Sequence, residues 1–281
     1  MNATHRIDCG MPALLEFRGP DAVRFLNGQL TQDVKLLEGG IISLPSCVTD
    51  AKGKLQFRVW ITAAGEGRLW IEGPADRAEE LEARLTRYLI ADDVEVSDLS
   101  GQWTLLHLIG ESPPAPDGVV VRACTRFGVP GSDWWLPAGM KTPALLGFPA
   151  LAGDGLEAFR IANGVPLWGR EITEGLLPPE AGLDATDISY QKGCYIGQEV
   201  ISRIKSAGKL NKRLARMEID GGWSAADTRL VDEEGRDAGT ITSVSPVESG
   251  GCRAALGYLK RGVERVFLET PDGKRQPLRL I

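Results

Sequence analysis

The eight residues Lys192-Gly193-Cys194-Tyr195-Ile196-Gly197-Gln198-Glu199 carry the clearest signal of fold and function in this chain. They combine one thiol, two glycines, an amide and two opposite charges. The apolar residues Val200, Ile201 and Ile204 follow at helical spacing, which predicts a loop that leads into a helix. A cysteine just before a helix faces unpaired backbone N–H groups and the positive end of the helix dipole. Both favour the thiolate, so the pattern predicts that Cys194 is reactive near neutral pH.

The same cysteine also has an ordinary interpretation. Free cysteine is among the most buried residue types and commonly packs as a small hydrophobe. Two features favour a functional role instead. Gly193 and Gly197 allow tight turns and a close backbone approach to a ligand, while Lys192 and Glu199 make the surroundings polar. Local chemistry alone leaves both interpretations open.

Length and composition restrict the class of protein. At 281 residues the chain is too long for one ordinary core, so we expect two or three subdomains. Its 43% hydrophobic and 25% charged residues are typical of soluble globular proteins. No apolar stretch is long enough to span a membrane, and residues 1–10 lack the core of a signal peptide. We therefore expect a cytoplasmic protein without membrane association.

The cysteines and histidines show no signature of a metal centre. The five cysteines are widely separated and include no Cys-x-x-Cys pair, which argues against disulfides and against a self-contained zinc or iron–sulfur site. His107, one of two histidines, lies in an apolar run that predicts a core position. No Gly-x-Ser-x-Gly sequence accompanies it, which argues against a serine hydrolase. We therefore predict no metal ligands.

The charge pattern argues against stable nucleic-acid binding, because the formal net charge is −6. A local exception follows the cysteine stretch, where basic residues occur without an intervening acid. They are Arg203, Lys205, Lys209, Lys212, Arg213 and Arg216. Such a run is often a solvated surface. Its position is equally consistent with binding an anion, such as a carboxylate or a phosphate.

Periodicity predicts an α+β organisation in three parts. Residues 1–100 contain predicted strands at 13–17, 41–48, 55–61, 68–72 and 94–96, and helices after Gly19-Pro20-Asp21 and near 75–89. Residues 101–211 form a second α+β part that carries the cysteine stretch. From 212 to 281, short apolar runs alternate with Gly, Asp and Pro turns, which predicts a small β-barrel or sandwich. A Walker A loop and a Gly-x-Gly-x-x-Gly after a strand are absent, which argues against the common nucleotide-binding folds.

Three separated segments resemble the YgfZ family of folate-binding proteins, which are relatives of the glycine-cleavage T-protein (aminomethyltransferase). Residues 192–199 are similar to that family's Lys-Gly-Cys-Tyr/Phe-x-Gly-Gln-Glu signature. The others are residues 19–34, with Phe25-Leu26-Asn27-Gly28-Gln29-Leu30-Thr31-Gln32-Asp33-Val34, and Asp50-Ala51-Lys52-Gly53-Lys54. The segments keep the family's order, and the β-rich end matches the family's C-terminal barrel. The resemblance therefore spans nearly the whole chain.

The resemblance implies a three-lobed, aminomethyltransferase-like fold around a central cavity that binds tetrahydrofolate or a derivative. It also implies an accessory role in assembling or repairing iron–sulfur enzymes, including enzymes that modify tRNA, with those enzymes or their assembly factors as partners. Cys194 corresponds to the family residue most tied to function. Lys192, Gln198, Glu199 and Arg203 correspond to the surrounding motif and are candidate folate-binding residues. The basic run would then meet the glutamyl carboxylates of folate.

Three further residues are candidates for folate binding. Trp168 offers a flat ring for stacking on the pterin, although large aromatic side chains commonly pack in cores. Asn27 and Gln29 belong to the second similar segment and could reach the cavity from the first part of the chain. An exposed position on a helix is the alternative for Asn27.

Two departures separate this chain from the aminomethyltransferases that it resembles. Those enzymes carry an Asp-Asp pair where this chain has Phe57 and Arg58. Methylene transfer without that carboxylate loses electrostatic stabilisation of the developing positive charge. They also have Arg-x-Glu-x-Gly where this chain has Arg160-Ile161-Ala162-Asn163-Gly164, and alanine cannot hydrogen-bond to the pterin. We therefore expect an accessory protein, with a one-carbon transferase or a folate-free adaptor as alternatives.

Overall fold

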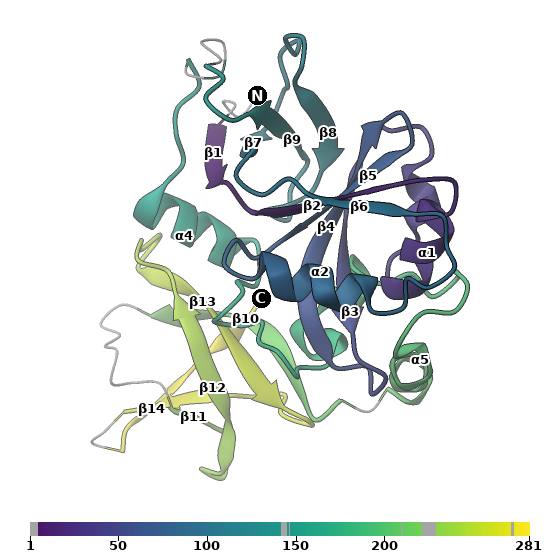
Figure 1. Ribbon diagram of the computed structural model, residues 1–281. Helices are drawn as coiled ribbons and strands as arrows, with labels where there is room; N and C mark the ends of the chain where they lie inside the picture. The colour runs from purple at the N-terminus through teal and green to yellow at the C-terminus, as the bar shows by residue number, and fades with distance from the viewer. Residues whose placement is uncertain (1–4, 142–144, 146, 209, 221–228, 271–272) are drawn as a thin grey trace. The chain divides into compact units, whose positions relative to one another are not determined.

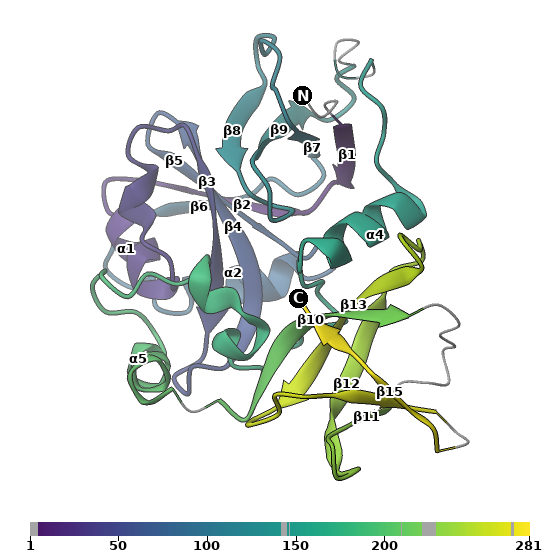
Figure 2. The same ribbon diagram turned by 180° about the vertical axis from the view of Figure 1, so that it is seen from behind.

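The computed structural model describes residues 5–141, 145, 147–208, 210–220, 229–270 and 273–281. The chain divides into two compact units, Met1–Leu151 with Leu183–Ser202 and Ala152–Gly182 with Arg203–Ile281. Within the described residues, the first unit contains a five-stranded and a four-stranded antiparallel sheet, and the second contains a seven-stranded one (Figures 1 and 2).

The five-stranded sheet has the order β3-β4-β5-β2-β6. Its strands are β2 (Ala13–Arg18), β3 (Ser43–Thr49), β4 (Leu55–Gly65), β5 (Arg68–Gly73) and β6 (Glu95–Asp98). It is accompanied by α1 (Ala22–Gln29), the 3-10 helix η1 (Val34–Leu37) and α2 (Ala78–Thr86). Phe25 and Leu26 of α1, with Leu81 and Leu85 of α2, join the sheet's apolar side chains in one core. Burial of this face is what makes two short helices stable.

The turn between β3 and β4 is built by Asp50 and Gly53. The Asp50 carboxylate accepts hydrogen bonds from the main-chain N–H groups of Lys52 and Lys54, each at 2.8 Å. Gly53 has a φ of +71°, a conformation that glycine adopts at little cost. The sequence Asp50-Ala51-Lys52-Gly53-Lys54 therefore encodes a rigid hairpin turn.

The four-stranded sheet has the order β1-β7-β9-β8. Its strands are β1 (His5–Gly10), β7 (Trp103–Ile109), β8 (Val120–Cys124) and β9 (Gly131–Pro137). Trp70 of β5 lies 4.6 Å from Trp103 and 5.7 Å from Trp135, measured between ring centroids. These rings pack the two sheets of the first unit against each other. The first unit also contains the 3-10 helix η3 (Leu183–Ala185).

The second unit is built on the sheet β15-β14-β11-β12-β13-β10-β16. Its strands are β10 (Lys212–Asp220), β11 (Arg229–Val231), β12 (Asp237–Val244), β13 (Cys252–Lys260), β14 (Phe267–Glu269), β15 (Arg275–Pro277) and β16 (Arg279–Leu280). The sheet curves into a nearly closed barrel around Met217, Ile219, Leu230, Leu259 and Leu268. The unit also holds α4 (Gly153–Ala162), which lies beside β13 in Figure 2, and the 3-10 helix η2 (Pro178–Ala181). The predicted α+β class and C-terminal barrel are confirmed.

Candidate functional site

Cys194 lies in a loop of the first unit that leads into α5 (Gln198–Ala207), and its side chain is exposed. The loop and three other segments form an open pocket of about 620 Å³ around it. The other lining residues are Gln29, Ala51, Tyr88, Tyr195, Ile196, Gly197, Gln198 and Glu199. The thiol is therefore accessible to a ligand or to a partner protein.

The loop takes its shape from a close fit against the β3–β4 turn. Gly197 has a φ of +88°, and a Cβ at this position would lie 2.5 Å from the Asp50 carbonyl oxygen and 2.8 Å from Thr49 Oγ1. The Thr49 hydroxyl donates a hydrogen bond to the Ile196 carbonyl oxygen at 2.6 Å. Glycine is required at 197 both for its backbone conformation and for space. Two segments that are distant in the sequence are joined in this way.

Lys192 fastens the other end of the loop to α1. Its buried ammonium donates hydrogen bonds to the carbonyl oxygens of Asn27, Leu30 and Gln32, each at 2.7 Å. These carbonyls lie at and just beyond the C-terminal end of α1, where unpaired oxygens and the helix dipole favour a cation. Burial lowers the pKa of Lys192 to about 7, and the carboxylate of Asp33 opposes that shift.

An ammonium has three N–H bonds, and the three carbonyls use all of them. A folate would have to displace one of these hydrogen bonds to bind Lys192 directly. The geometry therefore favours a role for Lys192 in positioning the Cys194 loop.

Gln29 and Asn27 of α1 face different surroundings. Gln29 is buried, lines the Cys194 pocket and accepts a hydrogen bond from Arg84 at 3.0 Å. Arg84 also donates to Gln56 at 2.5 Å, so this guanidinium connects Gln29 to β4. The Asn27 side-chain oxygen accepts a hydrogen bond from the Val34 amide at 3.0 Å and thereby stabilises the turn after α1.

The remaining candidates lie on α5 and in the second unit. Gln198 and Glu199, at the start of α5, line the Cys194 pocket, and Arg203 is exposed on the same helix. Trp168 belongs to the second unit, in the segment between α4 and η2, and is half-buried. Lys209, in the basic run, lies outside the described residues.

Arg58 replaces the expected carboxylate on β4, and its charge is balanced by Asp187. The guanidinium donates to the Asp187 carboxylate at 2.6 and 3.2 Å, and Asp187 is fully buried. The Thr186 hydroxyl donates to the same carboxylate at 2.6 Å. A carboxylate is therefore present near this strand, but an ion pair neutralises it. A partly buried arginine needs an acidic partner, but the sequence does not indicate which residue supplies it.

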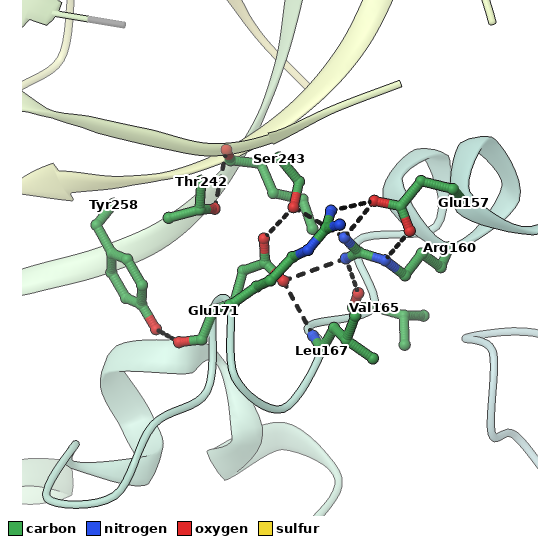
Figure 3. A network of polar contacts seen from close by, with 10 residues as sticks. Glu157, Arg160, Val165, Leu167, Glu171, Thr242, Ser243 and Tyr258 are labelled. Carbon is green, nitrogen blue, oxygen red and sulfur yellow. Dashed lines mark hydrogen bonds and ion pairs between the residues drawn. The ribbon is translucent and has the colours of Figure 1, made fainter. Parts of the chain in front are cut away.

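A second polar network fixes the segment that carries Trp168 (Figure 3). Arg160 of α4 donates to Glu157 at 2.7 Å, to Glu171 at 3.1 Å and to Ser243 at 2.8 Å. The Ser243 hydroxyl in turn donates to the other Glu171 oxygen at 2.5 Å. Arg160 stands in the Arg-x-Glu-x-Gly position, where Ala162 replaces the glutamate. The partners of this arginine all belong to its own unit.

Glu171 is the centre of that network. Its carboxylate accepts a hydrogen bond from the Leu167 amide at 3.0 Å, and its main-chain oxygen accepts one from the Tyr258 hydroxyl at 2.6 Å. Burial alone would raise the pKa of Glu171, but the hydrogen bonds from Ser243 and Leu167 lower it below its usual value. Neither Glu171 nor Asp187 was identified from the sequence, because isolated acidic residues carry no motif.

Comparison with known proteins tests the resemblance. No family model matches this chain. It is 28% identical to "Aminomethyltransferase" of Rubrobacter xylanophilus, over 94% of this chain and 78% of that protein. It is 29% identical to "tRNA-modifying protein YgfZ" of Shigella boydii and of Escherichia coli, over 85% of this chain and 80% of each relative. The predicted resemblance is confirmed.

A comparison with solved structures establishes the fold. Aminomethyltransferase T of the glycine cleavage system from Bartonella henselae matches 99% of this chain, over 85% of its own length, with a TM-score of 0.79. At 21% sequence identity this match shows the fold alone. The chain therefore has an aminomethyltransferase fold. Among the described helices, none is long and apolar enough to cross a membrane.

The relatives carry two different names at nearly equal identity, so overall similarity does not separate the two activities. The residues that differ in chemistry are more informative. Phe57 and Arg58 occupy the strand positions that the resemblance assigns to an Asp pair, and Arg58 brings a positive charge that Asp187 balances.

Proposed function

We propose that this protein is a tetrahydrofolate-binding accessory protein that supports the assembly or repair of iron–sulfur enzymes, including enzymes that modify tRNA. In this proposal it acts through Cys194. The role in tRNA modification is supported by the relatives named "tRNA-modifying protein YgfZ". The folate and the iron–sulfur clients are inferred from the resemblance of the three segments to that family.

One observation carries the proposal: the three similar segments meet at one pocket. Gln29 comes from the first of them, Ala51 from the second, and Cys194 with Gln198 and Glu199 from the third. Segments selected only for fold would have no reason to converge around an exposed thiol. The convergence favours Cys194 as a working residue over its interpretation as a packing residue.

The thiol could act by transient metal ligation, by thiol chemistry or by capture of a folate-derived carbon. A single cysteine cannot hold an iron–sulfur cluster unaided, because such clusters use about four protein ligands. Any cluster that meets Cys194 would therefore need cysteines of a partner protein. The exposure of this side chain permits such an approach.

The side chains around the pocket suit parts of a folate. Gln198 and Glu199 offer an amide and a carboxylate that can hydrogen-bond to a pterin, and the exposed Arg203 can pair with a glutamyl carboxylate. In this proposal Gln29 contributes a further amide. The bound folate would supply one-carbon chemistry, and these residues would orient it.

A one-carbon transferase is the second candidate, favoured by the similarity to a protein named "Aminomethyltransferase". The Arg58–Asp187 ion pair counts against it. A carboxylate that is buried and paired with a guanidinium does little to stabilise a further positive charge in a transition state. Detection of methylenetetrahydrofolate made from an aminomethyl donor would favour this second candidate.

The first experiment is an anaerobic titration with tetrahydrofolate, followed by tryptophan fluorescence and calorimetry. We would compare the wild-type protein with Cys194→Ser and with the matched control Cys252→Ser, which changes a half-buried thiol in the second unit. We expect saturable binding in all three proteins. Absence of saturable binding in the wild type would remove folate from the proposal.

The second experiment measures iron–sulfur enzyme activity and tRNA modification in cells that depend on this chain. Cys194→Ser should lose the supporting activity, while Cys252→Ser keeps it. Circular dichroism of both purified variants verifies that they remain folded. Full activity with Cys194→Ser would refute the assigned role of the thiol.

A further inference from the structure

Three side chains with metal-binding atoms meet inside the four-stranded sheet, outside the Cys194 pocket. They are His107 of β7, Cys124 at the end of β8 and Asp133 of β9, and all three are buried. One ligand atom from each lies within 4.8 Å of the others. His107 Nδ1 is 2.8 Å from Asp133 Oδ1 and 3.6 Å from Cys124 Sγ.

We propose that His107, Cys124 and Asp133 bind a divalent transition-metal ion such as Zn²⁺. The donor set of one imidazole, one thiolate and one carboxylate suits a borderline cation and does not suit Mg²⁺ or Ca²⁺, which take oxygen ligands. Three protein ligands leave a fourth position for water or another molecule.

The distances are close to those of such a site. Bonds of about 2.1 Å to nitrogen and about 2.3 Å to sulfur at a tetrahedral angle put the two atoms about 3.6 Å apart. The observed separation of Nδ1 and Sγ is 3.6 Å. The nitrogen and oxygen of a tetrahedral site lie about 3.3 Å apart. The Nδ1–Oδ1 separation of 2.8 Å must therefore widen slightly, as the hydrogen bond between them is replaced by two bonds to the metal.

The buried carboxylates around the cluster can balance the charge of an added cation. Arg126 donates to Asp133 at 3.0 and 2.7 Å and to Glu72 at 2.8 and 2.5 Å, so one guanidinium faces two buried carboxylates. Metal binding releases the thiol proton of Cys124 to solvent and converts the thiol to thiolate. Two carboxylates and one thiolate then balance one guanidinium and one divalent ion. Arg126 remains an outer partner that orients the ligating carboxylate.

The imidazole can adopt the tautomer that ligation requires. Among the described residues, Nε2 of His107 has no hydrogen-bond partner. The tautomer with the hydrogen on Nε2 leaves Nδ1 as the metal ligand, and it gives up the hydrogen bond from Nδ1 to Asp133.

In this proposal the ion enters from a neighbouring pocket that Cys124 borders. Cys124 lines a pocket of about 340 Å³ in the first unit, together with Ser43, Pro45, Gly131 and Thr186 among others. The fourth coordination position is expected to face this pocket, since Cys124 is the ligand that borders it.

Strand pairing explains why sequence spacing does not reveal the cluster. His107 pairs directly with Asp133, and Cys124 pairs with Gly131 on the same strand. Gly131 makes room for the ring, because a Cβ there would lie 2.6 Å from His107 Nε2. The three ligands therefore come from three strands.

The test is a titration of the purified full-length protein with Co²⁺ under anaerobic conditions, followed by displacement with Zn²⁺. Binding at this site should produce a near-ultraviolet band from thiolate-to-cobalt charge transfer, at one ion per chain. Cys124→Ser should abolish the band, and His107→Gln should weaken binding by at least the roughly 10–100-fold expected for loss of an outer partner.

Cys252→Ser and Cys194→Ser are the matched controls, because both remove a thiol outside the cluster and should keep the band. Far-ultraviolet circular dichroism checks that each variant is folded. No charge-transfer band in the wild type, or a band that survives in folded Cys124→Ser, would overturn the proposal. Loss of the band in Cys194→Ser would assign the metal to the pocket thiol and would also overturn it.

Discussion

Two segments that carry candidate site residues are held by buried charges of opposite sign, and the two charges have different partners. In the first unit, the Lys192 ammonium binds three main-chain carbonyl oxygens. In the second, the Glu171 carboxylate binds the side chains of Arg160 and Ser243 and the main-chain amide of Leu167. We call these the lysine anchor and the glutamate anchor.

The difference teaches which kind of substitution each region can absorb. The lysine anchor depends on main-chain carbonyl groups that every residue type supplies, so the three hydrogen bonds of Lys192 do not require particular side chains at its partner residues. The glutamate anchor depends on the identity of its partners, because a lost partner leaves another buried charge unpaired. Lys192→Met and Glu171→Gln test this contrast most directly.

Lys192→Met should have the largest effect, a loss of about 3 kcal/mol in the free energy of unfolding, because three carbonyls lose their donor together. The Cys194 loop should also loosen, so alkylation of this thiol should proceed at a changed rate. Urea denaturation and a timed reaction with iodoacetamide measure the two effects. Lys192→Arg, which keeps a cation, should recover part of the stability. Stability unchanged in Lys192→Met would refute the lysine anchor.

Glu171→Gln should cost about 2 kcal/mol, since Arg160 keeps only Glu157 as an acidic partner. The amide oxygen can still accept the hydrogen bond from the Leu167 N–H group, so the loss should be smaller than in Lys192→Met. Glu157→Gln is the control, because that side chain is 24% exposed and water can replace part of its contact. A larger cost for Glu157→Gln than for Glu171→Gln would contradict this ranking.

The pH dependence of stability should distinguish the anchors by its direction. The pKa of Lys192 is about 7, below the 10.5 of an unperturbed lysine, so the unfolded state binds the proton more tightly. The free energy of unfolding should therefore rise between about pH 7 and 10.5, by up to about 1.4 kcal/mol per pH unit. This rise should vanish in Lys192→Met. A flat profile in the wild type would mean that three carbonyls hold the proton as firmly as water does.

Glu171 should act at the acidic end of the range. Its pKa is lowered, so its stabilising effect is present above the ordinary value of 4.5 and is lost as pH falls through the folded-state pKa. Comparing wild type with Glu171→Gln between pH 3 and 6, by urea denaturation, isolates this contribution. Equal acid sensitivity in the two proteins would assign the acid response to other groups.

Tyr258→Phe should have the smallest effect, a loss of about 1 kcal/mol, because it removes one hydrogen bond to the Glu171 main chain. The Lys212 ammonium lies 4.4 Å from the ring centroid, and that contact survives the change. Thermal denaturation is sensitive enough to detect the difference. Destabilisation as large as that of Glu171→Gln would show that the hydroxyl, rather than the carboxylate, holds the segment.

The sequence predicts helices and turns correctly where their residues follow a known local pattern. The helix predicted near 75–89 is α2 at Ala78–Thr86, and the hairpin turn at 50–54 forms as Asp50 and Gly53 require. The C-terminal end of the helix differs, because residues 87–88 form a turn beyond the last buried leucine of the helix, Leu85. The roles assigned to the individual site residues stay predictions, among them the binding of folate by Trp168.

Other features depend on contacts between distant segments and had no local signal. His107 was predicted to be a core residue, and it is fully buried. Its pairing with Asp133 and its closeness to Cys124 follow from the register of three strands. Likewise Arg58 was recognised as a departure from the aminomethyltransferase pattern, whereas its partner Asp187 was not, because 129 residues separate them.

The sequence by itself determined the family resemblance and the α+β class, because glycines, turns and periodicity act over a few residues. It also predicted a functional site at the stretch around Cys194. Only the tertiary structure decided what each charged side chain does. In the folded protein the Lys192 ammonium binds three carbonyl oxygens, Arg58 pairs with Asp187, and His107, Cys124 and Asp133 lie close together. The physical reason is that a buried charge must be matched by whatever group the fold brings near it, and chain distance carries no information about that group.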